Sequence, residues 1–187
     1  LSENGVLDAT TDPAKIREWW TKHPTANVAL HAGDAGLMVL DLDPDPDKPG
    51  LRTVEQVASN LRRQLPEVPE TLVFAKTPRG GTHLYYALNP GERIAPSQSK
   101  LADAVDVRSW HSYVLLPPSR TGDGVYQWIG HPALSHPAHR TDEMVRRASV
   151  AKEANAERHV WLIAADLPEN VDRAIKWLKG EEAVGGQ

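Results

Sequence analysis

The stretch Leu37-Met38-Val39-Leu40-Asp41-Leu42-Asp43 organises the chain around it. Its short aliphatic run predicts a strand that is buried on both faces rather than a helix. Because successive side chains of a strand point to opposite faces, Asp41 and Asp43 are expected on one face, with Leu42 turned away. Two carboxylates this close repel each other, so the pair predicts a hard divalent cation such as Mg²⁺ or Mn²⁺ as ligand. The alternative interpretation is structural, with the carboxylates ending the strand at the turn into Pro44.

The length of 187 residues is typical of one domain with at most a small appendage. The chain contains no cysteine, which excludes disulfides, thiolate zinc sites and a cysteine nucleophile and fits a reducing cytoplasm. No stretch approaches the roughly 20 apolar residues of a membrane span, and no signal peptide is visible. The net charge of −4 argues against a surface coated in basic side chains. It leaves nucleic acid open as a partner, because a carboxylate-rich metal site would mask a local basic groove.

Strand and helix patterns are interleaved up to residue 139. Strands are expected over residues 27–31, 37–43, 71–75, 82–88, 104–108, 112–116 and 125–129, with 89–98 as a loop. Helices are expected over 53–65 and from 13 to before Pro24, the latter because Asp12-Pro13 is a typical helix start. The first two strands are expected to pair across a turn at 33–36, and the next two to form a hairpin. After about residue 140 the pattern predicts three short amphipathic helices and no strand. The chain is therefore predicted to be α+β, with a core at 1–139 and a helical unit at 140–187.

A second informative stretch lies between the two strands of the predicted hairpin. Lys76 and Arg79 supply positive charge, and Gly80 and Gly81 let the backbone approach a ligand closely and offer amides to phosphate oxygens. The following strand presents His83. These features together are typical of a triphosphate cradle. Taken alone, an ordinary solvated hairpin turn is the better interpretation.

A third stretch, Val105-Asp106-Val107-Arg108, places the acid and the arginine on one strand face and the valines on the other. An acid that emerges between buried valines is costly unless it is paired or bound to metal. A surface ion pair between Asp106 and Arg108 is the equally favoured alternative. In the following Pro117-Pro118-Ser119-Arg120, the hydroxyl and the guanidinium fit an anion site, and a rigid turn fits equally well.

The order of these motifs resembles the bifunctional DNA primase/polymerase (prim-pol) family of the archaeo-eukaryotic primase superfamily. The resemblance covers about Asp8 to Trp128 and includes the segment 9–27. It implies that Asp41, Asp43 and Asp106 are catalytic and hold two Mg²⁺ or Mn²⁺ ions, and that His83 and Arg79 bind the triphosphate. Further nucleotide-binding candidates come from the cradle, the third stretch and the proline-rich loop: Lys76, Gly81, Arg108, Ser119 and Arg120.

The resemblance also implies a fold and a function. The fold would be an archaeo-eukaryotic primase catalytic core, an RRM-like sheet with an N-terminal αβ unit, over residues 1–139, followed by a small C-terminal helical bundle over 140–187. The function would be template-dependent nucleotidyl transfer, as DNA primase and DNA polymerase, in phage, plasmid or mobile-element replication in the cytoplasm. The partners would be a single-stranded DNA template, dNTP or NTP, and a helicase domain or subunit, without a membrane.

Two departures and two alternatives accompany this resemblance. The family usually begins with another helix and strand before the Asp8 region, so the chain is expected to be shortened or to begin late. Trp110-His111-Ser112 stands where many members have a Gly-Gly pair. A haloacid-dehalogenase-type phosphatase also has a strand ending in Asp-x-Asp, although Asp45 stands where a Thr or Val normally follows. The other alternative is a non-catalytic nucleic-acid-binding module of a replication protein.

Overall fold

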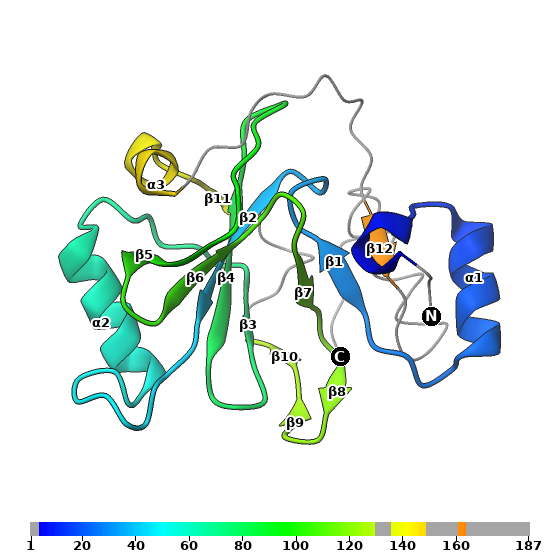
Figure 1. Ribbon diagram of the computed structural model, residues 1–187, viewed down its shortest axis with the longest axis horizontal. Helices are drawn as coiled ribbons and strands as arrows, with labels where there is room; N and C mark the ends of the chain where they lie inside the picture. The colour runs from blue at the N-terminus through cyan, green and yellow to red at the C-terminus, as the bar shows by residue number, and fades with distance from the viewer. Residues whose placement is uncertain (1–3, 130–135, 149–160, 164–187) are drawn as a thin grey trace.

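A computed structural model describes residues 4–129, 136–148 and 161–163 (Figure 1). The fold is α+β with a mostly antiparallel sheet. The helices are the 3₁₀ turn η1 (Gly5–Asp8), α1 (Pro13–Lys22), α2 (Val54–Gln64) and α3 (Asp142–Arg147). The strands are β1 (Ala29–His31), β2 (Leu37–Leu42), β3 (Phe74–Lys76), β4 (Thr82–Ala87), β5 (Ser97–Ala102), β6 (Val105–Arg108), β7 (Tyr113–Leu115), β8 (Arg120–Thr121), β9 (Gly124–Val125), β10 (Gln127–Trp128), β11 (Ala138–His139) and β12 (Trp161–Ile163). Among the helices of the described ranges, none is long and apolar enough to cross a membrane.

The strand at the centre of the main sheet is β2. The strand order is β10-β3-β4-β2-β6-β5, every pairing along this path is antiparallel, and β11 adds a parallel pairing to β4. All four residues from Leu37 to Leu40 are buried, which confirms that the strand is covered on both faces. The hairpin of β3 and β4 is also confirmed.

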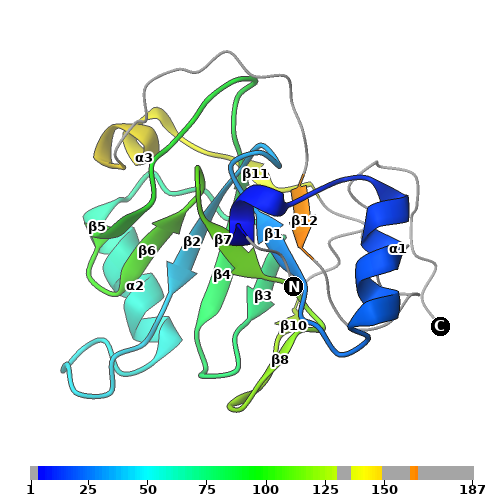
Figure 2. The same ribbon diagram turned by 45° about the vertical axis from the view of Figure 1, so that its right-hand side comes forward.

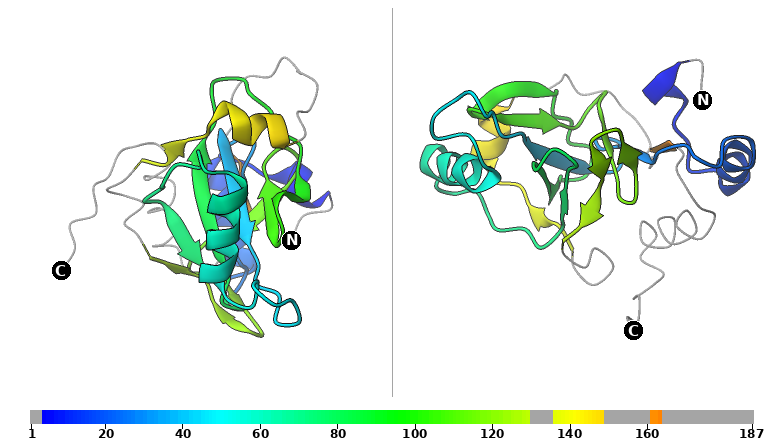
Figure 3. Two further views of the ribbon diagram at one scale, coloured as in Figure 1. Left: turned by 90° about the vertical axis from the view of Figure 1, so that its left-hand side faces the viewer. Right: turned by 90° about the horizontal axis from the view of Figure 1, so that it is seen from below.

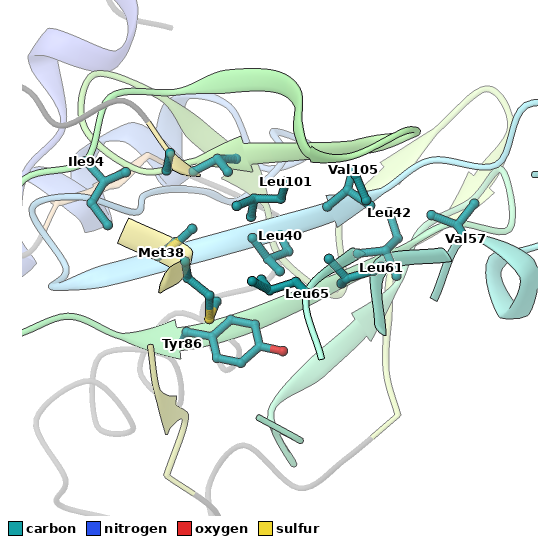
Figure 4. Close-up of a cluster of buried hydrophobic side chains, with 14 of the residues drawn as sticks. Met38, Leu40, Leu42, Val57, Leu61, Leu65, Tyr86, Ile94, Leu101 and Val105 are labelled. Atoms are coloured by element: carbon teal, nitrogen blue, oxygen red, sulfur yellow. The ribbon is translucent and has the colours of Figure 1, made fainter. Parts of the chain in front are cut away.

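Alternate side chains of β2 enter two separate hydrophobic clusters. Met38, Leu40 and Leu42 belong to the cluster that α2 and α3 cover (Figure 4). Figure 3 shows α2 lying along this face of the sheet. Leu37 and Val39 belong to the second cluster, which side chains of α1, β1 and β7 cover. The next residue on the Val39 face of β2 is Asp41. It lies beyond this cluster and lines cavities instead of a hydrophobic core.

Beside the main sheet, α1 packs with a second, three-stranded sheet of the order β12-β1-β7 (Figure 2). The helix begins as the sequence predicts, because the Asp12 side chain accepts a hydrogen bond from the Ala14 amide and Pro13 takes the first helical position. It ends at Lys22, before Pro24. Trp19 and Trp20 are buried on the face that meets the sheet.

The predicted pairing of the strand at 27–31 with β2 is wrong. Both edges of β2 are taken by β4 and β6, and β1 instead lies between β7 and β12 in the other sheet. The chain crosses from one sheet to the other at the 33–36 turn. There, a Cβ atom on Gly33 would stand 2.7 Å from the Trp110 backbone, so the turn is packed against the segment that follows β6.

Three other predictions need correction. The loop expected at 89–98 runs into β5, because its polar side chains need no core when the strand lies at the sheet edge. The strand expected at 125–129 is divided between β9 and β10. The helical prediction holds for α3 but is wrong at Trp161–Ile163, which pairs antiparallel with β1 and completes that sheet. The rest of the predicted helical bundle lies outside the described residues, and the division at residue 140 stays a prediction.

Candidate active site

Three polar side chains stand in one row across the middle of the main sheet. In the strand register Asp41 on β2 is opposite His83 on β4 and also opposite Asp106 on β6. Residues in register on neighbouring strands project from the same face. The tertiary structure therefore brings together residues from three motifs that are 42 and 23 positions apart (83 − 41 and 106 − 83) in the chain.

Asp43 follows the end of β2, and it lines the same cavity of about 240 Å³ as Asp41 and His83. Leu42, the residue between the two acids, is buried in the opposite hydrophobic cluster. The sharing of one cavity by the two carboxylates follows from strand alternation, as the sequence predicts. The β3–β4 turn and the β8–β9 hairpin form the other walls of this first cavity.

Each carboxylate has a cationic or imidazole partner. The Arg108 Nη2 atom lies 3.0 Å from Asp106 Oδ2 and 3.5 Å from Asp41 Oδ2, so one guanidinium bridges two acids. The His83 Nε2 atom lies 3.5 Å from Asp41 Oδ1. Arg79 Nη2 donates to Asp43 Oδ2 over 3.0 Å. The pair of Asp106 and Arg108 that the sequence offered as an alternative thus exists, but as part of a larger cluster.

The electrostatic environment shifts the pKa values of Asp41 and Asp106 in opposite directions. Burial alone would raise the pKa of Asp41, but the hydrogen bond with His83 and the charges of His83 and Arg108 hold that pKa below its ordinary value. Burial raises the pKa of Asp106, and the nearby carboxylates of Asp41 and Asp43 add to the rise against the opposing effect of Arg108. The acids therefore repel one another, as expected for oxygen donors gathered for a cation.

Backbone groups in an unusual conformation support two of the acids. The Ser99 amide donates to Asp106 Oδ1 over 3.2 Å, and the Asp43 amide donates to the Ala104 carbonyl over 3.0 Å. Ser99 and Ala104 have φ angles of 51° and 61°, and His111, which borders the site, has 55°. In the described ranges no other residue except glycine has a positive φ. Left-handed non-glycine residues cost free energy, and here all of them lie around one site.

The turn between β3 and β4 is packed against the end of β2. The Gly81 amide donates to Thr77 Oγ1 over 3.0 Å, and Gly80 has a φ of 85° that favours glycine. A Cβ atom on Gly81 would stand 2.5 Å from the Leu42 carbonyl oxygen, so only glycine fits there. This close contact brings Arg79 to the first cavity. Lys76 is exposed and is not among the residues that line the first cavity.

The structure does not bring Ser119 and Arg120 to the cavity. Ser119 is fully buried, and its hydroxyl accepts from the Val28 amide and donates to the Val28 carbonyl. The backbone of Arg120 exchanges two hydrogen bonds of 2.7 Å with the Asn27 side chain. The proline-rich loop is therefore a turn that ties the start of β8 to the residues just before β1, which is the alternative that the sequence left open.

Sequence reasoning missed five residues that line the first cavity: Thr77, Pro78, Thr121, Asp123 and Tyr126. The Tyr126 ring centroid lies 5.7 Å from that of His83. Asp123 comes from the β8–β9 turn, at a position with no motif around it. Only the strand pattern at 125–129 pointed to this region, and it carried no chemical signal.

The donor set fits a hard divalent cation in kind. Asp41, Asp43 and Asp106 offer only carboxylate oxygens, the ligands that Mg²⁺ and Mn²⁺ prefer. Among the described residues no three acidic or histidine side chains converge closely enough to form a complete metal site. Arg108 and Arg79 instead contact the oxygens that a metal would use. Metal binding would therefore compete with these guanidinium groups for the carboxylate oxygens.

A family model described as bifunctional DNA primase/polymerase, N-terminal, matches residues 1–144. The chain therefore belongs to this family, and the resemblance seen in the order of its motifs is confirmed. No curated protein matches the chain. The matched range includes every residue of the site described above and extends into α3.

Proposed function

We propose that the chain catalyses template-dependent nucleotidyl transfer and acts as a DNA primase and DNA polymerase. The observation that carries the proposal is the register of Asp41 between His83 and Asp106, in the middle of the main sheet, in a chain of the primase/polymerase family. Family membership supports this class of reaction. The row supports it further, because it places carboxylate oxygens beside groups that suit a triphosphate.

Asp41, Asp43 and Asp106 would hold two Mg²⁺ or Mn²⁺ ions. Such ions, when bound, activate the 3′-hydroxyl group of the growing chain and neutralise the leaving pyrophosphate. The contribution of the protein is to hold its three carboxylates in place, which the strand register and the backbone bonds from Ser99 and to Ala104 achieve. No side chain of the row needs to act as a strong base.

Arg79, His83 and the glycine turn would bind the triphosphate of the incoming nucleotide. Arg79 is two-thirds exposed at 67% and pairs with Asp43, so it is placed to transfer its charge-assisted bond to a phosphate oxygen. His83 is buried, and its Nδ1 atom has no hydrogen-bond partner in the described structure, whereas Nε2 faces Asp41. Arg108, which the sequence also predicts to bind the nucleotide, contacts Asp41 and Asp106 and is not among the residues that line the first cavity.

The substrates would be a single-stranded DNA template and dNTP or NTP, with a helicase domain or subunit as partner in the replication of a phage, plasmid or mobile element. Family membership alone supports these partners. The phosphatase alternative gains no support, because Asp45 turns into its own loop, where its carboxylate lies 3.1 Å from Lys48 Nζ.

Primer extension on a single-stranded template, in Mg²⁺ and in Mn²⁺, tests the proposal. The wild type should add nucleotides in the order that the template dictates, and Asp41→Ala should abolish this. Asp103→Ala is the matched control, because Asp103 is exposed on the β5–β6 turn and does not line the first cavity. Template-independent addition, or full activity of Asp41→Ala, would overturn the proposal.

A further inference from the structure

A second cavity, of about 470 Å³, also borders the row at Asp41 and His83. It shares Asp41, His83 and Tyr126 with the first cavity. Its remaining wall comes from Val6 in η1, from Arg108 in β6 and from residues 111–115, which lead into and form β7. The two cavities therefore meet at the row, and one extended ligand can occupy both.

The two cavities differ in their chemistry. Around Asp41 and Asp43 the first cavity adds the Arg79 guanidinium and two threonine hydroxyls, which suit a phosphate chain. The second cavity has Val6, Val114 and Leu115 in its wall, together with the aromatic ring of Tyr113. Tyr113 is 54% exposed although it is a large aromatic residue. Apolar and aromatic surfaces of this kind suit a sugar and a base, because every base has a face that stacks.

Tyr126 lies where the two cavities join. Its backbone amide donates to the Ser119 carbonyl over 2.8 Å, which fixes its position between β9 and β10. Burial, and next the charge of Asp41, raise the pKa of its hydroxyl group, while the charge of Arg79 opposes this rise. The hydroxyl therefore stays protonated at neutral pH beside the acids of the first cavity.

Contacts of Trp110, outside the second cavity, fix the segment that forms the wall of this cavity. The Arg93 guanidinium carbon lies 3.3 Å from the centroid of the Trp110 ring, and the Trp110 amide donates to the Ile94 carbonyl over 2.9 Å. His111 follows in a left-handed conformation, and β7 then pairs with β1. This segment is the one in which the chain departs from the Gly-Gly pair of many family members. The packing of Trp110 thus supports His111, Ser112 and Tyr113, which line the second cavity.

We propose that the second cavity binds the nucleoside part of the incoming nucleotide while the first cavity binds its triphosphate. The inference rests on the proposed function, since it places the substrate of that reaction. A nucleotide bound in this way crosses the row at Asp41, with its sugar at Tyr126 and its base against Tyr113. His111 and Ser112, which line the second cavity, then contribute to nucleotide binding, and Trp110 fixes their segment from outside the cavity.

Equilibrium binding of two ligands in Mn²⁺ without template separates the two cavities. The ligands are inorganic tripolyphosphate, which lacks a nucleoside, and dATP. Tyr113→Ala should weaken dATP binding about 5-fold or more, the effect of losing one stacking contact, and leave tripolyphosphate binding unchanged. Arg79→Ala should weaken the binding of both ligands. Tyr113→Phe keeps the ring and should bind both as the wild type does. Because Tyr113 is exposed, thermal unfolding of its variants should match the wild type.

Three results would overturn the inference. The first is unchanged dATP binding by Tyr113→Ala, and the second is an equal loss for tripolyphosphate. The third is a loss of affinity for a single-stranded oligonucleotide with dATP affinity intact, which would assign the cavity to the template or the primer end. If the predicted binding pattern appears but no nucleotide is incorporated, the nucleotide site stands and only the polymerase function fails. If the wild type polymerises and Tyr113→Ala binds dATP normally, the polymerase function stands and the assignment of the second cavity fails.

Discussion

Asp41 and Asp106 are direct register partners on neighbouring antiparallel strands, and a single guanidinium, that of Arg108, bridges them. Like charges opposite each other on paired strands destabilise a sheet. The Arg108 Nη2 atom, 3.0 Å and 3.5 Å from the two carboxylates, offsets this repulsion. The sheet therefore tolerates two acids at its centre, and this arrangement leads to specific expectations for stability.

Asp106→Asn should make the metal-free protein more stable at neutral pH, although it should abolish nucleotide incorporation. The raised pKa of Asp106 means that the folded state binds this proton more tightly than the unfolded state does. Its contribution to stability is therefore fully present below the ordinary aspartate pKa of about 3.9 and is lost as the pH rises through the folded-state value. Thermal unfolding in EDTA between about pH 4 and pH 7 measures this, and the gain of the variant should shrink as the pH falls.

Asp103→Asn is the control for this experiment, because Asp103 is exposed on the β5–β6 turn and its replacement should leave the unfolding temperature unchanged. A variant Asp106→Asn that unfolds at a lower temperature than the wild type at pH 7 would contradict the prediction. In that case the ion pair with Arg108 would outweigh burial and repulsion together.

Mn²⁺ should raise the unfolding temperature of the wild type but not that of Asp41→Asn or Asp106→Asn. A ligand that binds only the folded state stabilises it by RT ln(1 + [L]/Kd), about 2.7 kcal/mol at a concentration of 100 times Kd. Arg108→Gln should bind Mn²⁺ more tightly than the wild type, because the guanidinium no longer contacts the carboxylate oxygens. Calorimetric titration measures the affinities directly. Equal stabilisation of the wild type and the two aspartate variants would show that the ion binds elsewhere.

Gly81→Ala should destabilise the protein by about 1–3 kcal/mol, the range for forcing an extra carbon into a packed region. The new Cβ atom would stand 2.5 Å from the Leu42 carbonyl, which lies between Asp41 and Asp43. The displacement should therefore also lower the rate of incorporation. Urea unfolding and primer extension measure the two effects.

Gly122→Ala is the matched control for this substitution. Gly122 lies in the β8–β9 turn, where a Cβ atom would meet nothing within 4 Å and the φ angle is not left-handed. Its replacement should change stability by less than about 0.5 kcal/mol. If the two variants were equally stable, the close contact of the turn with β2 would not matter.

Met144→Ala should destabilise the protein by about 2–5 kcal/mol, because Met144 on α3 is fully buried in the cluster below β2. Arg146→Ala on the same helix should change stability much less, since the Arg146 side chain remains largely exposed in its ion pair with Glu143. A chain that ends at His139 loses this packing, whereas one that ends at Ala148 keeps it. Equal stability of these two truncated chains in urea would show that α3 is not part of the core.

The sequence alone was sufficient where the signal is local. The Asp12-Pro13 pair and Pro24 predicted the limits of α1, and Thr53 predicted the start of α2, whose Gln56 amide bonds to its side chain. The period of two along a strand placed Asp41 and Asp43 on one face, because side-chain direction depends only on the strand itself. The order of the motifs was enough to recognise the family, because that order can be read without knowing any tertiary contact.

Only the tertiary structure decided how distant segments meet. Whether β1 pairs with β2 depends on which strand edges remain open, and β4 and β6 had taken both edges of β2. Ser119 had the chemistry of an anion ligand, but the backbone of Val28 takes both of its hydrogen bonds. The second cavity and the position of Tyr126 arise from segments more than a hundred residues apart, as between Val6 and Tyr126. Such contacts are set by packing the whole chain, and no short stretch of it carries that information.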